Sequence, residues 1–203
     1  MEKTELIEWN VAGRPLADQM VSGDLHVVEP FAGGILLAAI DGVGHGDEAR
    51  AVAETAADVL KRSAGESVVY LVKRCHAALA KTRGAVMTLA SLDAADNTVT
   101  WVGVGNVEAR LFWAEADICH PCEHILLRGG LVGLQLPALQ PSIMPLARGD
   151  LLVFATDGIQ AGFEASINLT EPVRHMVEGI LRRHFKGTDD AMVLAARYNG
   201  SPS

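Results

Sequence analysis

The sequence predicts an α+β fold built mainly from antiparallel sheets. Along the 203 residues the apolar pattern indicates a strand, two amphipathic helices, a block of strands, one more helix and a last strand. Helices grouped apart from strands are typical of α+β proteins, whereas regular alternation would indicate a parallel sheet. Hydrophobic residues make up 49% of the chain, and no repeat or linker divides it. We therefore expect a single domain over residues 1–203, with 199–203 as a loose tail.

The first half of the chain contains both predicted neighbouring helices. Residues 35–40 form an apolar run of a length that suits a buried strand. Apolar side chains then recur every three or four residues over 47–62 and again over 67–83, which predicts two helices with one apolar face each.

The second half is predicted to consist mainly of strands. In chain order they are 85–92, 98–104, 107–113, 125–127, 151–155 and 192–196. Residues 103–106 lack the Lys-Ser/Thr of a phosphate loop and are expected to form a tight hairpin. Residues 137–145 contain three prolines and are expected to be irregular. Pro172 lies near the expected start of the last helix.

Composition excludes some functions. The net charge is −8, from 25 acidic and 17 basic residues, and no run of Lys and Arg could follow a nucleic-acid backbone. This disfavours a nucleic-acid partner and a two-metal nuclease. Three cysteines, no basic and apolar leader, and no apolar run long enough to span a bilayer predict a cytoplasmic protein without a membrane partner. We also expect a monomer.

Aspartates recur beside glycines or turns at the edges of the apolar strands. The four sites are Asp24, Asp41, Asp157 and the pair Asp189–Asp190. Taken singly, an Asp-Gly pair is equally typical of an ordinary turn. A carboxylate at the end of a buried strand, however, is costly to leave uncompensated. Hard divalent cations such as Mg²⁺ or Mn²⁺ prefer oxygen ligands, and two such ions can share a carboxylate and activate water.

The same segments resemble a known family. In chain order they are Ser22–Asp24, Ile40–Gly46, Gly84–Leu89, Val102–Val107, Gly129–Gly133, Arg148–Ile159 and Thr188–Val193. This ordered set, from about Ser22 to Arg197, resembles the PPM (type 2C) metal-dependent serine/threonine phosphatases. The resemblance is strongest to the bacterial branch typified by the sporulation stage II E phosphatase. It implies a sandwich of two antiparallel sheets flanked by helices on both faces.

The resemblance also implies the site. Asp41 would bridge two Mn²⁺ or Mg²⁺ ions, and a third ion is possible in this family. The other implied ligands are the Gly42 carbonyl, Asp24, Asp157 and Asp189. Asp190 would be an outer contact or a ligand of the additional ion.

Two histidine-containing segments have competing interpretations. His45 suits a general acid for the leaving alkoxide, but a turn histidine that caps the next helix is the simpler interpretation. The cluster Cys119–His124 holds four potential zinc ligands. Structural zinc sites usually draw ligands from two separated segments, so we favour an ordinary loop.

The short chain is similar to bare catalytic domains, above all to the feedback phosphatase of the stressosome. This similarity implies phosphoserine or phosphothreonine on STAS-domain stressosome proteins as substrates. The alternative is a catalytically silent relative that binds phosphoproteins. The retained aspartates favour an active enzyme, because a binding module has no evident need for four converging carboxylates.

Overall fold

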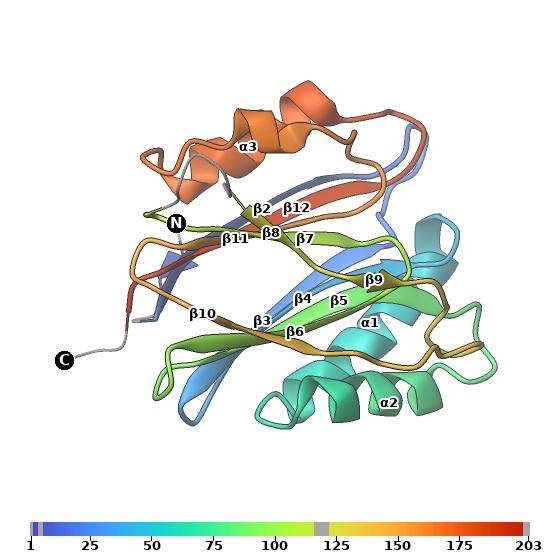
Figure 1. Cartoon of the computed structure of the whole chain (residues 1–203). Coiled ribbons are helices and arrows are strands. Elements are labelled where there is room, and N and C mark those ends of the chain that lie inside the picture. The colour runs from blue at the N-terminus through green and yellow to red at the C-terminus, as the bar shows by residue number, and fades with distance from the viewer. Residues whose placement is uncertain (1, 4–5, 116–121, 201–203) are drawn as a thin grey trace.

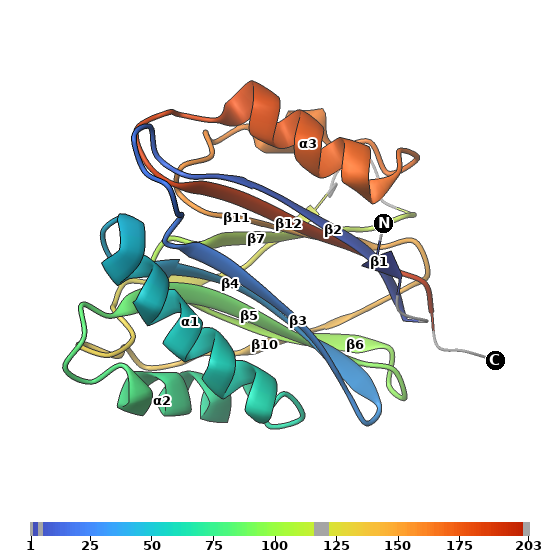
Figure 2. The ribbon, with the colours of Figure 1, turned by 180° about the vertical axis from the view of Figure 1, so that it is seen from behind.

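Two β-sheets are stacked face to face, with helices outside both of them (Figures 1 and 2). The computed structural model describes residues 2–3, 6–115 and 122–200. Sheet A has the order β1 (Glu2–Lys3), β2 (Ile7–Arg14), β12 (Ala191–Tyr198), β11 (Leu151–Ala155), β7 (Glu108–Phe112) and β8 (Cys122–His124). Sheet B has the order β10 (Ser142–Pro145), β6 (Thr98–Val104), β5 (Ala85–Asp93), β4 (Gly34–Gly42) and β3 (Asp24–Phe31).

The helices complete a four-layer arrangement. Helices α1 (Gly46–Arg62) and α2 (Val68–Ala78) cover the outer face of sheet B, and α3 (Val173–His184) covers sheet A (Figure 1). A short 3-10 helix, η1 (Phe163–Ser166), precedes α3, and β9 (Leu127–Arg128) pairs with β6 in parallel. This architecture confirms the predicted α+β sandwich. None of the helices in the described ranges is long and apolar enough to cross a membrane.

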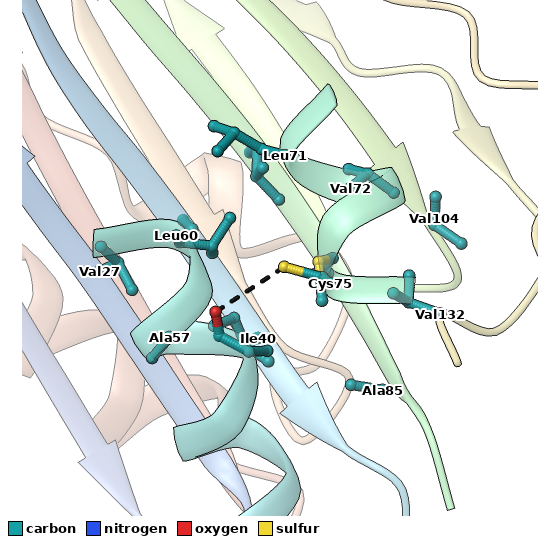
Figure 3. Packing of buried hydrophobic residues seen from close by; sticks show 14 of the residues in the cluster. Val27, Ile40, Ala57, Leu60, Leu71, Val72, Cys75, Ala85, Val104 and Val132 are labelled. Carbon is teal, nitrogen blue, oxygen red and sulfur yellow. Dashed lines mark hydrogen bonds between the residues drawn. The ribbon is translucent and has the colours of Figure 1, made fainter. Parts of the chain in front are cut away.

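Strand β4 shows why its sequence is a continuous apolar run. Leu36, Ala38 and Ile40 pack toward α1 and α2, while Leu37 and its alternate neighbours pack between the two sheets. Side chains on a strand alternate between faces, and here both faces are covered. Figure 3 shows the helix-facing cluster, in which the Cys75 thiol also donates to the backbone carbonyl of Ala56 in α1.

Several local predictions were wrong at the ends and edges of the sheets. Residues 142–145 form β10, an edge strand, where proline is tolerated because its missing N–H leaves no ladder position empty. In place of the expected strand 125–127, β8 ends before it at His124 and β9 begins at its last residue, Leu127. Residues 103–106 do not form a hairpin: 103 and 104 end β6, and 105–107 connect it to β7 (Glu108–Phe112) in sheet A.

Other boundaries differ less. The second helix ends at Ala78 instead of continuing to 83. At the C-terminus, β12 runs to Tyr198, and the Asn199 amide donates to the Leu6 carbonyl at 2.8 Å, so the expected loose tail begins later than predicted. Residues 201–203 of that tail lie outside the described residues.

Leu36→Ala and Leu37→Ala test the two apolar layers separately. Both side chains are fully buried, so each truncation should lower the free energy of unfolding by about 2–5 kcal/mol. Urea denaturation measures the change. The matched control is Leu134→Ala, since Leu134 is 59% exposed and its truncation should change stability by less than about 0.5 kcal/mol. A small loss at either buried leucine would contradict the four-layer packing.

Candidate metal centre

The predicted aspartates come together at one end of the sandwich. Asp24 begins β3 and faces Asp41 on β4 as its cross-strand partner. Asp157 follows β11, and Asp189 precedes β12, which is antiparallel to β11. In antiparallel pairs the end of one strand lies beside the start of the other. The two sheets therefore each contribute two carboxylates to the same edge.

Three of these carboxylates line one cavity of about 300 Å³. They are Asp41, Asp157 and Asp189, and the wall also includes His45 and Asn106. Asp24 lines the neighbouring groove between β3 and α1. Only 6% of Asp24 is exposed, so its carboxylate lies in the wall between the groove and the site.

Asp24 is tied to the opposite sheet by a buried hydroxyl. Thr156 donates from Oγ1 to Oδ2 of Asp24 at 2.7 Å, and the same hydroxyl accepts from the Met192 amide at 2.8 Å. Thr156 directly follows β11, so this chain of bonds links sheet A to sheet B. This role of Thr156 was not predicted, although Thr156 directly precedes Asp157 in the family-like segment Arg148–Ile159.

Burial and like charge raise the pKa values of aspartates in the cluster. Burial, and next the charge of Asp24, raises the pKa of Asp41 to about 8. Burial also raises the pKa of Asp24 to about 7, although the Thr156 hydrogen bond opposes the shift. No Lys, Arg or His side chain of the described residues forms a salt bridge with these aspartates. Clustered carboxylates without a salt-bridge partner fit hard divalent cations by their chemistry.

The side chains of the four aspartates do not converge on one point. Within the part of the chain that the structure describes, no three His, Cys, Asp or Glu side chains are grouped closely enough to hold a metal ion. Asp41 and Asp157 are both partly exposed to the cavity.

Asp157 is held from two sides. Asn106 donates from Nδ2 to Oδ2 of Asp157 at 2.8 Å. Lys186 donates from Nζ to the backbone carbonyl of Asp157 at 2.5 Å. Burial and then Asp189 raise the pKa of Asp157, while Lys186 and Asn106 lower it. Asn106 was not predicted as part of the site, because residues 103–106 were expected to form a hairpin.

Asp190 has a different environment from its neighbour. Its Oδ1 accepts from the Leu16 amide at 2.7 Å and its Oδ2 from the Gly23 amide at 2.6 Å. Both carboxylate oxygens therefore bind the connection between β2 and β3 and fix the backbone just before Asp24. Asp189, in contrast, accepts only a local bond from the next amide at 2.8 Å.

Glycines allow the strand ends to approach this closely. A Cβ on Gly42 would lie 2.2 Å from the Ala49 carbonyl oxygen, and one on Gly158 would lie 1.9 Å from the Asp190 carbonyl oxygen. Only glycine fits at such contacts. Close backbone packing thus requires the glycine of each Asp-Gly pair, Gly42 and Gly158.

The two histidine-containing segments have different outcomes. His45 occupies the position before α1, but its side chain makes no capping bond and is exposed at the cavity. Residues 119–121 of the cysteine cluster lie outside the described residues. Cys122 and His124 lie on β8, with Sγ and Nε2 3.5 Å apart.

Comparison with known proteins decides the family. A family model described as Stage II sporulation protein E (SpoIIE) matches residues 32–199. The chain belongs to this SpoIIE family. Among curated proteins no sequence match is found.

Solved structures share the fold over nearly the whole chain. RsbX in complex with magnesium matches with a TM-score of 0.86 at 18% identity, covering 98% of each chain. The PP2C phosphatase domain of SpoIIE from Bacillus subtilis matches with 0.74 at 18% identity, covering 97% of this chain and 64% of that one. A third match is a chain from a structure described as the bacterial stressosome, a modular system adapted to control secondary messenger signaling. Its TM-score is 0.86 at 29% identity, and the match covers 94% of this chain and 99% of that one.

These matches confirm the predicted SpoIIE-like branch and its PP2C-like fold. By family, the chain is assigned to the serine/threonine protein phosphatases, as the sequence predicted.

The raised carboxyl pKa values predict how the metal-free protein responds to pH. The ordinary value is 3.8, and the folded values are about 7 for Asp24 and about 8 for Asp41. The unfolded chain therefore releases these protons first, and the free energy of unfolding should fall as the pH rises from about 4 to about 8. Urea denaturation in EDTA across this range measures the slope.

Asp41→Asn should flatten that slope, because an amide does not ionise. The control Asp96→Asn removes an exposed aspartate in a turn and should leave the slope unchanged. An equal slope in the wild type and Asp41→Asn would show that Asp41 does not titrate in this range.

Proposed function

We propose that the chain is a metal-dependent phosphoserine/phosphothreonine phosphatase whose aspartates bind two Mn²⁺ or Mg²⁺ ions. The observation that carries this proposal is the placement of four carboxylates, none of them in a salt bridge within the described residues, at one end of a phosphatase-family sandwich. In this assignment Asp41 and the Gly42 carbonyl, with Asp24, bind from sheet B, and Asp157 and Asp189 bind from sheet A. The magnesium complex of the structurally similar RsbX supports a divalent cation.

When bound, two such ions supply an activated water for in-line attack on phosphorus without a protein nucleophile. The residues of the chain orient that chemistry. Thr156 holds Asp24 in the wall, and Asp190 holds the backbone before it. Because both oxygens of Asp190 already accept backbone amides, we give it this supporting role rather than that of a ligand for a third ion.

His45 is the candidate proton donor. It lines the same cavity as Asp41, Asp157 and Asp189, and no capping bond engages its side chain. An imidazole suits donation of a proton to the departing serine or threonine oxygen near neutral pH. In this proposal Nδ1 or Nε2 of His45 carries that proton.

We further propose phosphorylated STAS-domain proteins of a stressosome as the substrates. The support is the similarity to RsbX and to a chain studied in the bacterial stressosome, each covering more than nine-tenths of both chains. On the sequence grounds given above, we expect the reaction in the cytoplasm and a monomeric enzyme.

Asp41→Asn should abolish Mn²⁺-dependent hydrolysis of p-nitrophenyl phosphate. Loss of a bridging carboxylate should lower kcat/KM by more than about a hundredfold, since even outer-shell changes cost 10–100-fold at metal sites. Asp96→Asn is the matched control and should retain full activity. Activity that survives in Asp41→Asn, or a wild-type protein inactive with both Mn²⁺ and Mg²⁺, would refute the two-metal proposal and favour the silent phosphoprotein binder.

The substrate proposal needs its own test. Phosphorylated STAS-domain proteins are incubated with the enzyme and Mn²⁺, and mass spectrometry follows each phosphosite. We expect loss of phosphate from serine or threonine, and none with Asp41→Asn. If p-nitrophenyl phosphate is hydrolysed but the STAS phosphosites remain, the phosphatase assignment stands and the substrate assignment fails.

A further inference from the structure

Asn106 makes a contact that the two-metal scheme does not use. It lies in the connection from β6 to β7, and its Nδ2 donates to Oδ2 of Asp157 at 2.8 Å. The side chain is exposed and lines the cavity shared by Asp41, Asp157 and Asp189. Only the amide nitrogen can donate to a carboxylate, so the orientation of the amide is set by this bond.

The backbone that carries Asn106 is fixed on both sides. The Gly105 amide donates to the Arg128 carbonyl at 2.9 Å. On the other side, Val107 is fully buried, and its carbonyl accepts from the Thr88 hydroxyl at 2.6 Å. A side chain on such a backbone has few ways to move except about its own two torsions. Asn106 is therefore built on a rigid support.

Structural explanations for an asparagine at this position are weak. Asparagine is often selected for a left-handed backbone, but among the described residues the non-glycine positions with positive φ are Asp18, Lys81 and Asn97. The side chain is not buried, so it does not fill the core. The contact with Asp157 is what remains to explain it.

We propose that Asn106 is a positioning residue for Asp157. By holding Oδ2, its amide keeps the carboxylate aimed into the cavity and leaves Oδ1 available to a cation. The inference rests on the proposed function, because it takes Asp157 as a ligand. Groups that orient a ligand typically contribute 10–100-fold to metal affinity or activity.

The test compares Mn²⁺ binding with stability in the absence of metal. Asn106→Leu keeps the size of the side chain and removes its donor. Isothermal titration of metal-free protein with Mn²⁺ should show the dissociation constant of at least one ion raised about tenfold or more. The kcat at saturating Mn²⁺ should fall by a smaller factor than the affinity does, because excess metal refills a weakened site. The melting temperature in EDTA should not change, since the side chain is exposed.

Two further variants separate positioning from structure. Asn106→Gln retains an amide donor and should recover part of the affinity. Asn168→Ala removes an exposed asparagine whose side chain hydrogen-bonds to Thr170 and Glu171 in its own turn, and it should bind Mn²⁺ as the wild type does. Wild-type Mn²⁺ affinity in Asn106→Leu would overturn the inference. A lower metal-free melting temperature in Asn106→Leu would overturn it too, because the weaker binding would then follow from lost stability.

Asp157→Asn, measured under the same conditions, distinguishes the metal-ligand role of Asp157 from the positioning role of Asn106. If Asp157→Asn weakens Mn²⁺ binding and Asn106→Leu does not, the positioning role is refuted and the metal site stands. If Asp157→Asn binds Mn²⁺ as tightly as the wild type, Asp157 is not a ligand, and both the metal assignment and the inference fail together.

Discussion

Burial of carboxylates at one end of the sandwich, reinforced by the repulsion between them, is the constraint on which the site depends. Raising the pKa of Asp24 from 3.8 to about 7 corresponds to about 4 kcal/mol for keeping that group charged in the metal-free fold. Fully burying one large apolar side chain contributes about 1.5–3 kcal/mol. Two or three of the many buried leucines, isoleucines and valines therefore offset one such carboxylate, and the fold tolerates a cluster that opposes its own stability.

Hydrogen bonds between the sheets keep that cluster in place. Thr156, after a strand of sheet A, holds Asp24 of sheet B, and Asp190 holds the Gly23 amide from the same side. Asn106, on the connection between the sheets, holds Asp157. None of these three contacts lies within a single sheet, so the relative position of the sheets and the geometry of the site are set together.

The sequence predicted the layers and the aspartates because both depend on local patterns. A run such as residues 35–40 ending in Asp41 is readable from periodicity, and the Asp-Gly pair marks the strand end. The strands β2 and β3 were not predicted as such, since their half-buried residues follow no clean alternation. Asn106 and the role of Thr156 were missed for another reason. Their partners lie 51 and 132 residues away in the chain, and only the stacking of the two sheets brings them together.

The spread of the carboxylates also follows from this architecture. Asp24 and Asp41 are opposite one another in a ladder, where Cα atoms are about 4.5–5.5 Å apart. Their backbones are therefore already as close as a shared cation requires. A cation bound by both side chains would supply the opposite charge that these carboxylates lack, and it would relieve the repulsion between them that raises the pKa of Asp41.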